Sequence, residues 1–165
     1  MVDPQIRNLR EEDYPYLRSV VNDWWAGRQI ADLMPRFLFQ HFQTTGFAAV
    51  ADGAPPQIVG FLIGFVSPTH PEQAYIHLVG IDPSYRGRGL GRALYDRFFE
   101  TARGFGCRYV RCITTPTNQA SIEFHRRMGF KVEPGDAVTA AGIAVRSNYS
   151  GIGQDRVCFV KDLRS

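Results

Sequence analysis

The chain has 165 residues, of which 44% are hydrophobic and 21% charged, so we expect residues 1–165 to form one globular domain with a single core. Its net charge of +3 is too small to indicate binding to nucleic acid. The sequence has no apolar run of membrane-spanning length and no signal-peptide pattern at its start, so we expect a cytoplasmic protein that does not enter a membrane.

The first 46 residues predict one short strand and two helical stretches. Apolar and polar residues alternate at residues 6–9, which is typical of a strand. Acidic residues at 11–13 then open a helix, and apolar residues recur at helical spacing from Tyr14 to Trp24. A second helix is expected from about Ile30 to Phe42, with Pro35 placed for an early turn or a kink.

Three apolar segments with short turns between them follow, at residues 47–51, 58–66 and 75–81. The middle segment is apolar on both faces and therefore reads as a central strand. Because short turns join neighbouring antiparallel strands, the three segments predict an antiparallel meander.

The second half alternates helices and strands. A helix follows residue 90 and ends at Gly104 or Gly106, and a strand is predicted at 109–114. A strand, a helix and a strand in this order imply a parallel pair. A helix from Asn118 to Gly129, a strand at 130–133, a loop at 135–154 and a strand at 157–160 complete the chain. The element order predicts an α+β fold, a mixed sheet with helices on both faces.

The segment between the third meander strand and the following helix has the composition of an anion-binding turn. Asp82-Pro83-Ser84 ends the strand, and Arg86-Gly87-Arg88-Gly89-Leu90-Gly91-Arg92 places three glycines among three arginines at the start of a helix. Glycines let backbone N–H groups approach a phosphate, the helix N-terminus adds partial positive charge, and arginine suits phosphate oxygens.

We compared this turn with three phosphate-binding motifs. The simpler alternative is that the turn is only structural. A P-loop requires a Gly-Lys-Ser/Thr ending, which is missing. A dinucleotide motif needs a small residue where Arg92 stands and an acidic residue about twenty positions on, where Arg108 and Arg111 stand. A pyrophosphate motif of the form Arg-x-x-Gly-x-Gly/Ala fits without a mismatch.

Two segments resemble motifs of the GNAT superfamily of N-acetyltransferases. Residues 81–91, Ile-Asp-Pro-Ser-Tyr-Arg-Gly-Arg-Gly-Leu-Gly, match its acetyl-CoA motif V/I-D-P-x-x-R/Q-G-x-G-x-G/A. Residues 118–130 are similar to its N-x-x-A-x-x-x-Y-x-x-x-G-F motif, with His125 at the tyrosine position. The order of elements also resembles the family's, least so in the first 50 residues and in the long loop. The resemblance implies the GNAT acyl-CoA N-acyltransferase fold, in which a mostly antiparallel sheet contains a parallel pair splayed at a bulge.

The same resemblance implies acetyl-CoA as a co-substrate, with no metal. The strand before the turn would pair with the pantetheine arm through Val79 and Ile81, with Gly80 easing the bulge, and Asn118 would both cap its helix and contact the cofactor. The residues that we expect at the cofactor are Val79, Gly80, Ile81, Arg86, Gly87, Arg88, Gly89, Leu90, Gly91, Arg92, Asn118, Ser121, Phe124 and His125.

Two histidines are the candidate catalytic residues. His77 stands where many members of the superfamily have a glutamate base, and strand alternation would place it on one face with Val79 and Ile81. His125 replaces the tyrosine that protonates the leaving thiolate, and histidine can also donate a proton. The alternative for each is a structural role. Alternative bases are His70, Glu72 and Asp32, and the thiols of Cys107, Cys112 and Cys158 read as core.

The expected reaction is direct attack of an amine on the thioester in a ternary complex. In this superfamily the two N-terminal helices, here with Trp24, Trp25, Phe37 and His41, wall the acceptor site, and Tyr149 is a candidate for the opposite wall. The acceptor is expected to be a small-molecule amine, a protein N-terminus or a lysine. The chain is also compatible with forming a homodimer. The alternatives are a longer acyl donor and a non-catalytic CoA-sensing or partner-binding module.

Overall fold

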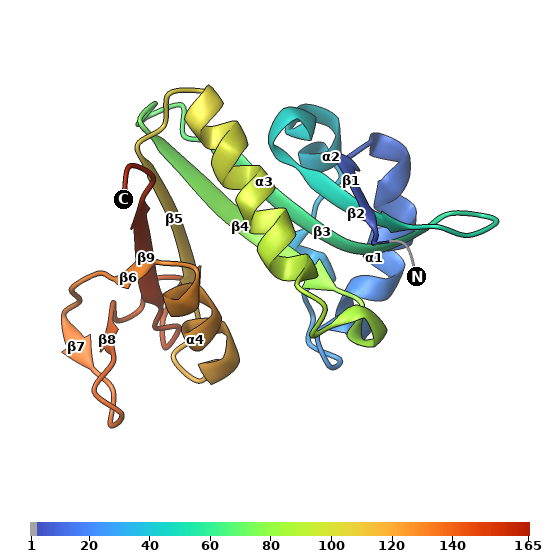
Figure 1. Ribbon diagram of the computed structural model, residues 1–165. Helices are drawn as coiled ribbons and strands as arrows, with labels where there is room; N and C mark the ends of the chain where they lie inside the picture. The colour runs from blue at the N-terminus through green and yellow to red at the C-terminus, as the bar shows by residue number, and fades with distance from the viewer. Residues whose placement is uncertain (1–2) are drawn as a thin grey trace.

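The computed structural model describes residues 3–165, which form a central sheet with helices on both faces (Figure 1). The larger sheet has the strand order β1-β2-β3-β4-β5-β9-β6, and all of its adjacent pairs except β4 and β5 are antiparallel. This confirms the predicted fold class, the meander and the parallel pair. The strands of this sheet are β1 (Gln5–Asn8), β2 (Phe47–Ala51), β3 (Gln57–Val66), β4 (Gln73–Ile81), β5 (Tyr109–Thr114), β6 (Lys131–Val132) and β9 (Val157–Asp162).

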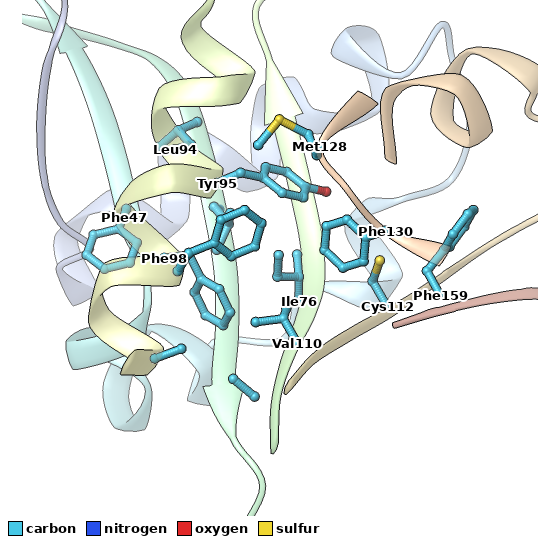
Figure 2. Close-up of a cluster of buried hydrophobic side chains, with 14 of the residues drawn as sticks. Phe47, Ile76, Leu94, Tyr95, Phe98, Val110, Cys112, Met128, Phe130 and Phe159 are labelled. Carbon is cyan, nitrogen blue, oxygen red and sulfur yellow. The ribbon is translucent and has the colours of Figure 1, made fainter. Parts of the chain in front are cut away.

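Helices from different parts of the chain cover the two faces. Leu17 and Val21 of the first helix belong to one buried cluster, whereas Leu94 and Phe98 of the third belong to another, so each face of the sheet has its own apolar core (Figure 2 shows the second). No helix within residues 3–165 has the length and apolar character needed to cross a membrane. The helices are α1 (Tyr14–Trp24), α2 (Phe37–His41), α3 (Leu90–Gly104) and α4 (Gln119–Arg127).

The prediction of one helix from Ile30 to Phe42 is wrong. The segment forms a 3₁₀ turn at Ala31–Leu33, the short helix α2, and a further 3₁₀ turn at Gln43–Thr45. The helix is interrupted at Met34, whose backbone lies outside the helical region (φ −124°, ψ 65°). Met34 precedes Pro35, and the residue before a proline avoids the α conformation. The broken helix leaves the side chains of Leu33 and Phe37 about half exposed, at 52% each.

The prediction of a long loop at residues 135–154 is also wrong, because this segment contains a second sheet. Strands β7 (Ala137–Val138) and β8 (Ala144–Val145) pair antiparallel as a hairpin. Gly135 allows the close approach on which this hairpin depends, since a Cβ there would lie 1.9 Å from the carbonyl oxygen of Val145. Gly and Ala dilute the apolar alternation in this segment, so its sequence gave a weak strand signal.

The Gly80→Ala substitution is expected to lower the free energy of unfolding by about 1–3 kcal/mol. A Cβ at Gly80 would lie 2.4 Å from Cε1 of Phe61, a fully buried ring on the neighbouring strand. Urea unfolding would measure the change. Gly104→Ala is the matched control, because a Cβ there meets no atom of residues 3–165 within 4 Å and alanine favours helix. Equal stability of the Gly80→Ala variant and the wild type would contradict the steric account.

Candidate functional site

The most distinctive feature of the sheet is the separation of β4 from β5. In the part of the chain that the structure describes, the two strands pair only over Gln73–Tyr75 and Tyr109–Arg111, and they then diverge toward α4 (Figure 1). A cavity of about 250 Å³ lies between them, lined by residues of both strands and by Trp25, Tyr95 and Phe124. The open edge of β4 can therefore accept an extended ligand as an added strand.

A bulge in β4 sets which side chains face this opening. Leu78 lies opposite Ile63 and Ile76 opposite Gly64, so His77 is an extra residue in the ladder with β3. The bulge lies three residues before Gly80, the position expected to ease it. It also reverses the alternation, because Ile76 packs on the α3 side whereas Leu78 belongs to the core on the α1 side.

The expectation that His77 shares a face with Val79 and Ile81 is consequently wrong. Val79 and Ile81 pack against the α3-side core, whereas the exposed ring of His77 reaches the α1 side, where Nε2 lies 2.7 Å from the carbonyl oxygen of Leu33. A carbonyl only accepts hydrogen bonds, so Nε2 carries the proton and Nδ1 keeps its lone pair when the ring is neutral. Nδ1 of His77 is therefore able to accept a proton beside the opening.

The glycine-rich turn has the geometry of an anion-binding loop. Asp82 accepts hydrogen bonds from the Ser84 backbone at 2.9 Å and from its hydroxyl at 2.6 Å, which fixes the start of the turn. Gly87 and Gly89 have φ values of 73° and 79°, a region that favours glycine. Among residues 3–165, no acceptor pairs with the N–H groups of residues 87–92. Six donors at the N-terminus of α3 are thus available to an anion.

The three arginines of the turn do not act alike. A cavity of about 450 Å³ in front of the loop is lined by Arg92, by Arg86 and by Arg127 of α4. The Arg86 side chain donates to the carbonyl oxygens of Trp24 and Ile81, so it ties the loop to the end of α1. Arg88 donates to Ser84 O at 3.1 Å and lies over the Tyr85 ring, lining a different cavity. Arg127 was not among the predicted cofactor residues, although its spacing three residues after Phe124 places both on one helix face.

The start of α4 is organised as predicted. Asn118 Oδ1 accepts a hydrogen bond from Ser121 N at 3.1 Å, which caps the helix. Asn118 and Ser121 line a further cavity, of about 350 Å³, together with Val79 of β4 and Trp25 beyond the end of α1. The capped end of α4 therefore lies beside the open edge of β4 and faces the residues that follow α1.

His125 is buried, with only 6% of it exposed, although the residue lines the opening between β4 and β5. Its Nδ1 donates to Ser121 O at 2.7 Å, its Nε2 accepts from the Tyr95 hydroxyl at 2.9 Å, and its ring stacks on Phe159. Figure 2 shows Tyr95 projecting from α3 toward Met128 and Phe130. Burial lowers the pKa of His125, so the ring is neutral and its one proton is held by a carbonyl. This geometry does not supply the free acid expected at His125.

Stability is expected to fall as the pH drops from 7 to 5, with His125 as one cause. Below its ordinary pKa near 6.5, the histidine of the unfolded chain binds a proton that the folded chain excludes, so protons favour unfolding. Thermal unfolding at both pH values would show a smaller loss for His125→Phe than for the wild type. The control is His70→Gln, in an exposed loop, which should lose as much stability between pH 7 and pH 5 as the wild type does. An equally large loss of stability in His125→Phe would contradict the role of His125.

The other candidates have structural surroundings. Asp32 is 3.7 Å from Arg18, and Glu72 accepts from the Gln73 side chain. Burial raises the pKa of the Cys112 thiol, which disfavours the nucleophilic thiolate although this residue lines the opening. In the described residues, no three His, Cys, Asp or Glu side chains gather as metal ligands. Of the proposed acceptor-wall residues, Trp24 is buried, and the exposed ones are Phe37, His41 and Tyr149.

Comparison with known proteins adds a family to this geometry. The model of the acetyltransferase (GNAT) family matches residues 4–130. An uncharacterized N-acetyltransferase of Methanocaldococcus jannaschii is 32% identical over 135 residues, which are 76% of this chain and 60% of that protein.

Two further similar proteins are an acetyltransferase named for its substrate and a solved structure that contains acetyl-CoA. The L-2,4-diaminobutyric acid acetyltransferase of Shouchella clausii is 35% identical over 72 residues, 44% of this chain and 40% of that enzyme. The chain thus matches only 40 to 60% of the length of these two relatives. Among solved structures, yncA of Salmonella typhimurium with its cofactor acetyl-CoA shares the fold, with a TM-score of 0.69 at 20% identity over 98% of this chain and 95% of that one.

Proposed function

The chain belongs to the acetyltransferase (GNAT) family, and on this basis we propose that it transfers an acetyl group from acetyl-CoA to a primary amine. The observation that carries the proposal is the continuity of two features. The unpaired edge of β4 runs directly into a loop whose six N–H groups have no partner within residues 3–165. An extended arm that ends in a pyrophosphate fits such a surface.

The residues present fit acetyl-CoA in three places. The loop donors, Arg92 and Arg127 are suited to the pyrophosphate, because charged donors strengthen hydrogen bonds to phosphate oxygens. The backbone of Val79 and Ile81 would pair with the pantetheine arm along the edge that faces β5. The thioester would then lie in the opening near Ser121 and Phe124, both of which line it.

His77 would act as the general base. A primary amine is protonated at neutral pH, and Nδ1 of the neutral imidazole takes one of its protons while Nε2 donates to Leu33 O. The free amine attacks the thioester carbonyl, so that an N–C bond forms and the C–S bond breaks. The thiolate takes up the second proton that the nitrogen loses. The protons balance without an acid from His125.

A second candidate function is a CoA-binding sensor or partner-binding module without catalysis. The observation that favours it is the state of His125, whose two ring nitrogens are occupied by Ser121 and Tyr95. An enzyme that depends on an acid at this helix position would be inactive with such a ring. Turnover by the wild-type protein would exclude this candidate.

The proposed function is tested by binding and turnover in the same preparation. Calorimetric titration with acetyl-CoA is expected to show one site, and CoA release with a panel of amines is expected to exceed the hydrolytic background. Binding without release for any amine would support the sensor. The absence of binding by the wild-type protein would overturn both candidates, since each needs the cofactor cleft.

A further inference from the structure

We propose that the acceptor is a primary amine that carries a large apolar or aromatic group next to its nitrogen. The group would lie on a surface that we call the apolar strip, formed by Leu33, Phe37, Phe42, Phe65 and Tyr75. This inference rests on the proposed acetyltransferase function and names the substrate class of the same site.

The four rings of the apolar strip follow one another toward the strand that carries the proposed base. Ring centroids follow one another at 6.4 Å from Phe37 to Phe42, 5.7 Å from Phe42 to Phe65, and 5.5 Å from Phe65 to Tyr75. Tyr75 precedes His77 by two residues on β4, before the bulge, so the two share a face. Leu33, the remaining member of the apolar strip, supplies the carbonyl that holds His77.

The apolar strip is exposed at Leu33 and Phe37, whereas Phe42, Phe65 and Tyr75 are half-buried. Leu33, at the end of a 3₁₀ turn, and Phe37, at the start of the short helix α2, are each 52% exposed although both are large apolar residues. Tyr149, in the segment after β8, is also about half exposed, at 47%. Apolar residues that gather beside a reactive group, rather than singly, mark a site for an apolar ligand.

The charges around the apolar strip disfavour an acceptor with a second ammonium group. Asp32 lies 3.7 Å from Arg18, next to the turn that carries Leu33. Glu11 and Glu133 pair with Arg36 and Arg111 in the same way. Each of these carboxylates is already neutralised by an arginine, so none offers a second ammonium group an unpaired negative charge. A monoamine with an apolar group needs no such partner.

A matched acceptor series tests the proposal. With saturating acetyl-CoA, kcat/KM from CoA release would be measured for 2-phenylethylamine, phenylalaninamide, ethanolamine, 2,4-diaminobutyrate and spermidine. Two peptides, one beginning with Phe and one with Ser, distinguish a small amine from a protein N-terminus as its source. We expect 2-phenylethylamine or the Phe compounds to exceed ethanolamine on the order of 10- to 200-fold, the range that apolar pockets give.

Variants assign that preference to the apolar strip. Phe37→Ala and Leu33→Ser should lower the ratio of kcat/KM for 2-phenylethylamine over ethanolamine by about 10-fold. Phe105→Ala should leave it unchanged, since Phe105 is as exposed as Phe37, at 56%, but follows α3. Calorimetry with acetyl-CoA accompanies each variant, to separate loss of the acceptor from loss of the donor.

The outcomes separate the two levels of inference. CoA release that is fastest with ethanolamine, diaminobutyrate or spermidine would overturn the apolar acceptor and leave the acetyltransferase function standing. Acetyl-CoA binding without release from any amine in the series would also count against the apolar acceptor. Failure of the wild-type protein to bind acetyl-CoA would overturn the proposed function itself.

Discussion

Charge reversal at Arg92 and Arg127 together is expected to raise the Kd for acetyl-CoA by about 10- to 100-fold. Both side chains line the cavity in front of the loop, and one comes from each of the two helices that meet there. A charge-assisted hydrogen bond contributes about 1.5–3 kcal/mol, but both arginines are solvent-exposed, which reduces the gain for each. Isothermal calorimetry at low ionic strength would measure the change, and the loss should shrink as salt is added.

Arg88→Glu is the matched control for this pair. Arg88 belongs to the same motif and has the same charge, yet its guanidinium donates to Ser84 O and lies over Tyr85. We therefore expect a change in Kd several times smaller than for the double variant. If Arg88→Glu weakens binding as much as the double variant does, the phosphates lie on the other side of the turn from the cavity proposed here.

His77→Gln is expected to lower kcat by about 10²–10⁴, the range of general-base contributions, with little change in the Kd of acetyl-CoA. Glutamine can still donate to Leu33 O, as Nε2 of His77 does, but its amide cannot take a proton from an ammonium group. CoA release at saturating acceptor and donor would measure the change. Because the variant needs an amine that is already neutral, its rate should rise toward high pH more steeply than the wild-type rate.

His41→Gln is the control for this substitution. His41 is an exposed histidine at the end of α2, on the same side of the sheet as His77. Because His41 is a candidate for the acceptor wall and not for the base, its replacement should change KM at most and leave kcat at saturating acceptor within about twofold of the wild type. An unchanged kcat in His77→Gln would refute the base assignment, and attention would turn to a base brought by water or by the acceptor.

Local features of the sequence predicted most of the fold. The three strands of the meander follow from short apolar segments bounded by turn residues, which act within a few positions along the chain. The cap at Asn118 and the glycine turn are equally local, since each depends on one side chain or on φ at two glycines. The helix at 30–42 failed for a local reason too, because Pro35 outweighed its apolar spacing.

The sequence by itself determined the order of most elements, the glycine-rich turn and the residue types at the candidate site. Only the tertiary structure decided what those residues touch. His77 meets Leu33 across 44 positions of the chain, and Arg86 meets Trp24 across 62. Tyr95 donates to His125 across 30, which occupies one ring nitrogen of the predicted acid. The reason is physical: one extra residue in β4 reverses which face a side chain takes, and that bulge depends on register with β3 and on packing against helices far away in the sequence.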